Sequence, residues 1–155
     1  MTNLVRLSLR LTFVVGVLAS LCFGIWSFQQ DYKRQKTIAR IKQTYTMLSV
    51  VGENYHTNVA LIIKDRVGSA GDLNQVLYAL VTEPDYFISH SMFRTNLISD
   101  PLVDSWGHPL EVIWRDDAAS TNISGRLMQS SASLLIIWST GPNGINEYGN
   151  GDDVY

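Results

Sequence analysis

The feature that most constrains the fold is an uncharged segment near the N-terminus. Residues 11–28 are eighteen consecutive residues that include no Asp, Glu, Lys or Arg. A helix of about this length just spans the hydrocarbon core of a bilayer, and a helix satisfies its own backbone groups in lipid. The sequence therefore predicts a transmembrane anchor helix over residues 1–29. Its predicted membrane-facing residues include Leu11, Gly16, Leu18, Leu21 and Trp26, the last at the interface.

Two other kinds of segment share this composition, namely a buried core helix and the apolar region of a cleaved signal peptide. Cleavage is disfavoured because no small-x-small pair follows the apolar run. Residues 19–22 are similar to a lipoprotein box, but Leu21 stands where that box needs a small residue. We therefore expect a retained anchor. More basic residues follow the segment than precede it, and this count alone favours a cytoplasmic C-terminal side.

The charges of the chain are unevenly distributed. Residues 1–66 hold nine Lys or Arg and three Asp or Glu, whereas residues 100–155 hold two and eight, and the net charge is −2. Such a balance excludes a generally basic nucleic-acid binder, and the single cysteine, Cys22, excludes an internal disulfide framework. A basic N-terminal part and an acidic C-terminal part indicate two different environments.

Beyond the anchor, apolar residues recur every three or four positions from Ile38 to Ile62, as on one face of an α-helix. With the anchor they predict one helical rod of roughly 50 residues, ending near Gly68, Gly71 and Asp72. The apolar stripe packs either on the chain's own domain or on a coiled-coil partner.

The remaining pattern predicts a small α+β domain over residues 30–155. Residues 73–81 form a second helical stripe, and residues 84–109 form a connecting loop. Residues 110–115 and 134–138 alternate or are continuously apolar, as strands do, with a short strand allowed at 126–129. We expect a long helix packed on a small antiparallel sheet, followed by an irregular C-terminal loop.

Several separated segments together resemble the major pseudopilin of type II secretion systems, a branch of the type IV pilin-like family. Asp104-Ser105-Trp106-Gly107-His108-Pro109 is similar to that family's Asp-Pro-Trp-Gly turn, and the C-terminal loop is similar to its calcium loop. The other matching segments are residues 16–21, 34–36, 77–84, 139–144 and 152–154.

The resemblance implies a pilin-like fold and a structural role in a secretion pseudopilus. It implies a single-pass protein of the bacterial inner membrane whose C-terminal domain is periplasmic, against the charge count. Implied partners are copies of the chain or other pseudopilins, contacted through the long helix, together with inner-membrane secretion components and membrane lipid. Nucleic acid is not among the expected partners.

The N-terminus departs from the family pattern. Family members carry a glycine, a phenylalanine and a glutamate around a peptidase cleavage site, but Leu7 stands in the glutamate position and Asn3 near the phenylalanine. No glutamate occurs before Glu53. We therefore expect no ordinary processing, which also puts ordinary filament assembly in question. The alternative function is a membrane-tethered binding module of the same fold that does not polymerise.

The C-terminal loop combines oxygen donors with glycines. Calcium takes six to eight oxygen ligands from a chain that can curl around it, and glycine permits such curling; a frayed polar tail is the plainer alternative. The resemblance implies that the calcium ligands are the carbonyl of Thr140 and the side chains of Asn143, Asp152 and Asp153.

No pattern of enzymatic chemistry is present. His56, His90 and His108 lack zinc-ligand spacing, and no nucleophile elbow, phosphate loop or dinucleotide fingerprint occurs. Trp106, Trp114 and Trp138 fit core or turn packing better than a sugar platform. We therefore expect no enzyme, and a tethered hydrolase remains the weakest alternative.

Overall fold

The computed structural model describes all residues except 1, 55–58, 71, 83–101, 119–120 and 131–133. The chain divides into two compact units, residues 1–33 and residues 34–155. The second unit contains the C-terminal part of helix α1 (Thr2–Asn54), helices α2 (Val59–Ala70) and α3 (Leu73–Thr82), strand β1 (Glu111–Trp114), helices α5 (Arg115–Ala118) and α6 (Gly125–Ser130), and strand β2 (Leu135–Trp138).

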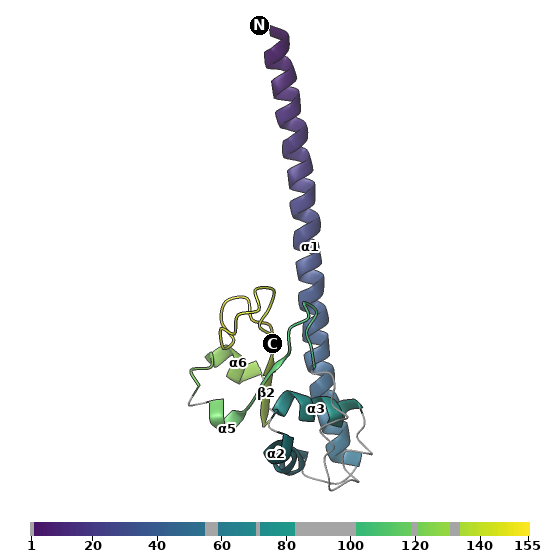
Figure 1. Ribbon diagram of the computed structural model, residues 1–155, viewed down its shortest axis with the longest axis vertical. Helices are drawn as coiled ribbons and strands as arrows, with labels where there is room; N and C mark the ends of the chain where they lie inside the picture. The colour runs from purple at the N-terminus through teal and green to yellow at the C-terminus, as the bar shows by residue number, and fades with distance from the viewer. Residues whose placement is uncertain (1, 55–58, 71, 83–101, 119–120, 131–133) are drawn as a thin grey trace. The chain divides into compact units, whose positions relative to one another are not determined.

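The first unit is a single helical segment of α1, coloured purple in Figure 1. No proline interrupts residues 2–54. Large apolar side chains lie exposed on every side of this segment, from Leu11 to Phe28. The hydroxyls of Thr12 and Ser20 donate to backbone carbonyls four residues earlier, so these polar groups are satisfied within the helix, as lipid requires.

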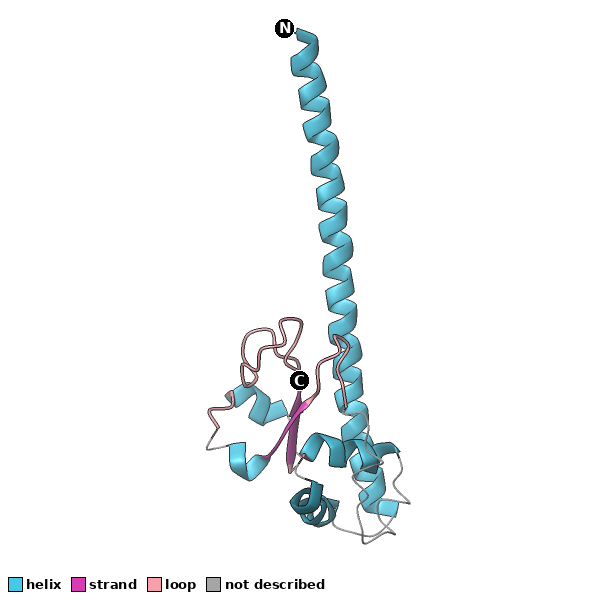
Figure 2. Ribbon diagram, in the orientation of Figure 1, coloured by secondary structure: helices cyan, strands magenta, loops and turns pink. Residues whose placement is uncertain are grey.

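The sheet of the second unit is a two-stranded antiparallel ribbon, drawn in magenta in Figure 2. Val112 pairs with Ile137 and Trp114 with Leu135, and all four residues of β2 are buried. This confirms the antiparallel sheet expected from the alternating segments, each strand lying within the range that the sequence predicted.

The core joins α1 to this ribbon. Ile41, Leu48 and Val51 from α1 pack in one buried cluster with Leu135 and Ile137 of β2. The apolar stripe after the anchor is therefore a core-facing surface within the chain's own domain. The cluster also contains Ile63, Val76, Leu77, Leu80, Leu102 and Leu110.

Tyr45 and Asn74 hold this core by hydrogen bonds to distant backbone. The Tyr45 hydroxyl accepts from the amide of Ile137 (2.9 Å) and donates to the carbonyl of Leu135 (3.3 Å). The Asn74 amide nitrogen donates to the carbonyls of Leu102 (3.1 Å) and Leu110 (2.5 Å), and its oxygen accepts from the Leu102 amide (2.6 Å). Tyr45 thus bonds backbone groups of β2 that do not pair with β1, and Asn74 bonds backbone groups of the segments around Leu102 and Leu110.

The sequence prediction of one continuous helix was wrong. The stripe was expected to form one helix through Ile62, but α1 ends at Asn54 and α2 begins at Val59; Gly52 and Asn54, both weak helix formers, stand at that end. Helix α2 ends at Ala70, within the boundary that Gly68, Gly71 and Asp72 predicted. The three- and four-residue spacing of apolar residues continues from α1 into α2 because both helices bury apolar side chains on one face.

The short strand expected at residues 126–129 is instead helix α6. The Ser124 hydroxyl accepts from the Leu127 amide (3.3 Å), as an N-terminal cap does. Leu127 is fully buried in a second cluster with Ile136 and Trp138. Packing on the outer face of β2 thus favours the helix. Most of the predicted connecting loop, residues 83–101, lies outside the described residues, as do His56 and His90.

Candidate functional site

The turn at residues 104–109 is organised by one buried carboxylate. Asp104 is 4% exposed, and its Oδ1 accepts from the amides of Trp106 (2.8 Å) and His108 (2.9 Å). Its Oδ2 accepts from the Ser139 hydroxyl (2.6 Å) at the end of β2. One side chain therefore shapes the turn and attaches it to the start of the C-terminal loop.

His108 makes a second connection between the turn and that loop. Its Nδ1 lies 3.0 Å from the carbonyl oxygen of Gly141 and 3.7 Å from Asp104 Oδ2. The Ser139 hydroxyl also accepts from the Gly141 amide (3.0 Å). The turn and residues 139–144, which are separate motifs in the sequence, are thus bonded together in the structure.

The C-terminal loop, residues 139–155, closes on itself. Ser139 and Val154 form an antiparallel bridge at its neck, with backbone hydrogen bonds of 2.9 and 3.0 Å. Gly151 has a φ of +55°, and a Cβ there would lie 1.7 Å from Glu147 Oε2. The positive φ favours glycine at this position, and a side chain there would displace the Glu147 carboxylate, which accepts from the Asp152 amide (3.1 Å).

Two of the predicted calcium ligands lie together within this loop. The Asn143 backbone amide donates to Asp152 Oδ2 (3.2 Å), and the Asn143 side-chain nitrogen donates to Asp152 Oδ1 (2.5 Å). Asn143 Oδ1 accepts from the Ile145 amide (2.7 Å). In this arrangement the amide group supplies the positive hydrogens that face the Asp152 carboxylate.

The other two predicted ligands stand next to the bridge on facing segments. Thr140 and Asp153 are 5% and 4% exposed. Asp153 Oδ2 accepts from the amides of Glu147 (3.2 Å) and Gly149 (2.7 Å). Its Oδ1 and the Thr140 Oγ1 are buried without a hydrogen-bond partner in the described chain. Buried polar groups are normally satisfied, so these two oxygens are the strongest local indication of a missing ligand.

Electrostatics at this neck also favour a bound positive charge. Burial raises the pKa of Asp153, the amides of Gly149 and Glu147 oppose that rise, and the charges of Glu147 and Asp152 add to it. Burial likewise raises the pKa of Glu111, with smaller contributions from Asp153 and Asp72. Carboxylates that repel one another in a buried place are each easier to protonate and gain from a cation.

The donor set fits calcium in part. Among the described residues, no group of three or more His, Cys, Asp or Glu side chains gathers as a metal site would need. Calcium accepts hydroxyl and backbone carbonyl oxygens as well as carboxylates. Asp153 Oδ1 and Thr140 Oγ1 are unsatisfied, whereas Asn143 and Asp152 satisfy each other. At Thr140 the unsatisfied oxygen is thus the hydroxyl, while the ligand implied by the resemblance was the backbone carbonyl.

Sequence reasoning missed three residues that position this site, namely Tyr45, Asp104 as a buried anchor, and Ser139. Asp104 had a local signal, because an aspartate two residues before a Trp-Gly pair is typical of a side chain that caps a turn. The bonds from Tyr45 to β2 span more than ninety residues of sequence, to Ile137 at a separation of 92, and no local pattern indicates them.

Comparison with known proteins places the chain in no group: no family model, no curated protein and no solved structure matches it. The described part of the chain contains one helix long and apolar enough to cross a membrane, judged by length and composition, and it lies near the N-terminus. A signal sequence passes the same test.

Proposed function

We propose that this chain is a membrane-anchored, pseudopilin-like structural subunit of a type II secretion pseudopilus in the bacterial inner membrane, with its C-terminal domain in the periplasm. The observation that carries the proposal is helix α1. One uninterrupted helix, Thr2–Asn54, exposes large apolar side chains from Leu11 to Phe28 and contributes Ile41, Leu48 and Val51 to the domain core.

The contacts among the motif segments support the same proposal. The turn at 104–109 is bonded to Ser139 and Gly141, and residue 143 is bonded to residue 152. Three of the segments that resemble the pseudopilin pattern, residues 104–109, 139–144 and 152–154, are thus bonded to one another.

In this proposal the exposed apolar side chains of α1 have two possible environments, lipid before assembly and neighbouring copies of the helix afterwards. An apolar helix surface this long is otherwise unfavourable in water. Because the segment lacks a glutamate before Glu53, association within the membrane would depend on apolar packing and on close approach at Gly16 and Gly24, where no other atom lies within 4 Å.

Cross-linking in membranes tests the assembly. The chain has one cysteine, Cys22, exposed on α1. A second cysteine, introduced as Leu11→Cys on the same exposed helix, allows oxidation to join successive copies. We expect a ladder of oligomers from this two-cysteine chain, whereas the native chain and the double variant Leu11→Cys/Cys22→Ser, which have one cysteine each, should stop at dimers. Monomers and dimers from the two-cysteine chain would contradict assembly.

The second candidate function is a tethered module of this fold that does not polymerise. It is favoured by Leu7, which occupies the position of the glutamate that family subunits use within the membrane. An absent ladder, combined with an uncleaved N-terminus in the mature protein, would support this second function.

We further propose that calcium stabilises the domain by binding at the loop neck, with Asp153 and Thr140 as ligands and Asp152 and Asn143 rearranged to join them. Thermal unfolding of the full chain in detergent tests this. At a calcium concentration of about 100 times Kd, binding adds roughly 2.7 kcal/mol to stability. We expect a chelator to lower Tm in the native chain, with no further effect in Asp153→Asn and a normal effect in Asp116→Asn, an exposed control. An identical Tm with calcium and chelator would refute the proposal.

A further inference from the structure

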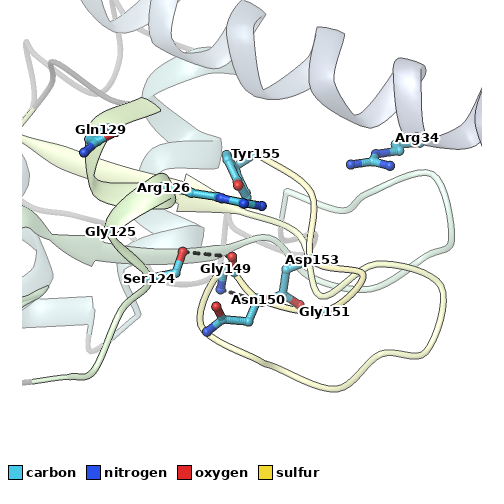
Figure 3. Close-up of a pocket in the computed structure, with 10 residues that line it drawn as sticks. All are labelled: Arg34, Ser124, Gly125, Arg126, Gln129, Gly149, Asn150, Gly151, Asp153 and Tyr155. Carbon is cyan, nitrogen blue, oxygen red and sulfur yellow. Dashed lines mark hydrogen bonds between the residues drawn. The ribbon is translucent and has the colours of Figure 1, made fainter.

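A polar pocket of about 760 Å³ lies between α1 at Arg34, helix α6 and the C-terminal loop, and Figure 3 shows the residues that line it. Gly125, Gly149 and Gly151 line it without side chains, which leaves space that side chains would otherwise fill. The Ser124 hydroxyl also lines the pocket and donates to the Gly149 carbonyl (2.8 Å). The other charged and hydrogen-bonding side chains are those of Arg34, Arg126, Gln129, Asn150, Asp153 and Tyr155.

The pocket holds two arginines from distant parts of the sequence. Arg34 lies on α1 and Arg126 on α6, both are exposed, and both guanidinium groups are directed into the pocket in Figure 3. No described side chain forms an ion pair or hydrogen bond with either. Asp153 is the one carboxylate side chain in the lining, and its Oδ2 is occupied by the amides of Glu147 and Gly149. Two cations therefore face one largely buried carboxylate, which favours an anionic group.

The position of Arg34 along the chain indicates where that anion is located. Arg34 follows Phe28, the last residue of the uncharged segment, by six residues, or about 9 Å along a helix. Even a fully extended chain of that length reaches only about 20 Å. The headgroup layer extends roughly 5 to 8 Å beyond each face of the hydrocarbon core. An arginine side chain at this point therefore reaches the depth of the lipid phosphates.

We propose that this pocket binds the phosphodiester headgroup of a membrane phospholipid, held between the guanidinium groups of Arg34 and Arg126. Arginine binds phosphate oxygens through paired N–H donors, and the Tyr155 hydroxyl is available on the same lining. The acyl chains stay in the bilayer. The inference rests on the proposed membrane anchor, and it assigns to the domain a second, specific attachment to lipid.

Native mass spectrometry of the full chain in detergent, titrated with phosphatidylglycerol, tests the proposal. We expect one bound lipid in the native chain and at least about tenfold weaker binding in the double variant Arg34→Gln/Arg126→Gln, because each charge-assisted bond contributes about a factor of ten. The control Lys36→Gln/Lys64→Gln removes the same charge from two exposed lysines outside the pocket and should bind as the native chain does. A phosphate-free galactolipid should not bind specifically.

Equal weakening in the two double variants, or equal binding of the galactolipid, would overturn the proposal. Displacement of the lipid by glycerol phosphate at an equal concentration would assign the pocket to a soluble phosphate compound and equally overturn it. Thermal unfolding of each variant separates lost binding from lost folding. Resistance to alkaline extraction from vesicles tests the anchor separately, since removal of the two arginines leaves residues 11–28 unchanged.

Discussion

Replacing Tyr45 by Phe tests how the helix holds the sheet. The hydroxyl accepts from the Ile137 amide at 2.9 Å and donates to the Leu135 carbonyl at 3.3 Å. Both backbone groups lie on the edge of β2 that does not pair with β1, and Ile137 is only 1% exposed. The substitution keeps the aromatic ring and removes only the oxygen, so its effect reports these two hydrogen bonds.

The expected cost follows from the burial of Ile137. A buried amide left without an acceptor costs about 1–3 kcal/mol, so we expect the free energy of unfolding to fall by about 2 kcal/mol. For a domain of this size, that loss lowers Tm by about 6 to 10 °C. The Ile137 amide should also exchange its hydrogen faster, because the local opening of the edge becomes easier.

Thermal unfolding of the full chain in detergent, followed by tryptophan fluorescence, measures this change. Tyr32→Phe is the matched control, since it removes the same atom from an exposed tyrosine on the same helix. If Tyr45→Phe and Tyr32→Phe shift Tm equally and the exchange at Ile137 is unchanged, the hydroxyl does not hold the sheet and the reasoning is refuted.

Three further perturbations test the loop and its anchor. Gly151→Ala puts a Cβ at a φ of +55° and displaces the Glu147 carboxylate that accepts from the Asp152 amide, so we expect a loss of about 1–3 kcal/mol, against almost none for Gly125→Ala, which has open space and an ordinary φ. Asp104→Ala leaves three donors without their acceptor and should cost about 3 kcal/mol or more in urea unfolding, whereas the exposed Asp116→Ala should cost less than about 0.5 kcal/mol. The raised pKa of Asp153 means that, with chelator present, its contribution to stability is complete below the ordinary pKa of 3.8 and is lost as pH rises through the folded-state pKa; Asp153→Asn should flatten that part of the stability profile, and an unchanged profile would contradict the burial argument.

The sequence predicted those parts of the fold in which apolar residues recur at a regular local spacing. The uncharged run and the stripe from Ile38 onward made α1 predictable, since a repeat of three to four residues shows which face is buried. Continuous apolar residues similarly indicated β2. Residues 126–129 were predicted as a short strand but lie within α6, because a segment this short shows no period that separates strand from helix and packing of Leu127 beside Ile136 and Trp138 favours the helix.

The candidate site was predictable only as a set of residue types. The sequence indicated that Thr140, Asn143, Asp152 and Asp153 share a loop, but not that Asn143 and Asp152 bond to each other while Thr140 Oγ1 and Asp153 Oδ1 are buried without a partner in the described chain. That division depends on the bridge between Ser139 and Val154, which fixes the side to which each neighbouring side chain turns. Long-range pairing of this kind has no signature in local composition.

The distance in sequence between Tyr45 and β2 also determines the order in which the domain can fold. The hydrogen bonds from Tyr45 join residues 90 and 92 positions apart, so α1 is synthesised long before the strand that covers it. Contacts at such separation slow folding because the intervening chain must first close into a loop. Until β2 arrives, Ile41, Leu48 and Val51 have no strand to pack against. The nascent chain therefore passes through a stage in which the apolar face of its helix is open, and a chaperone or the membrane surface would have its greatest effect during that interval.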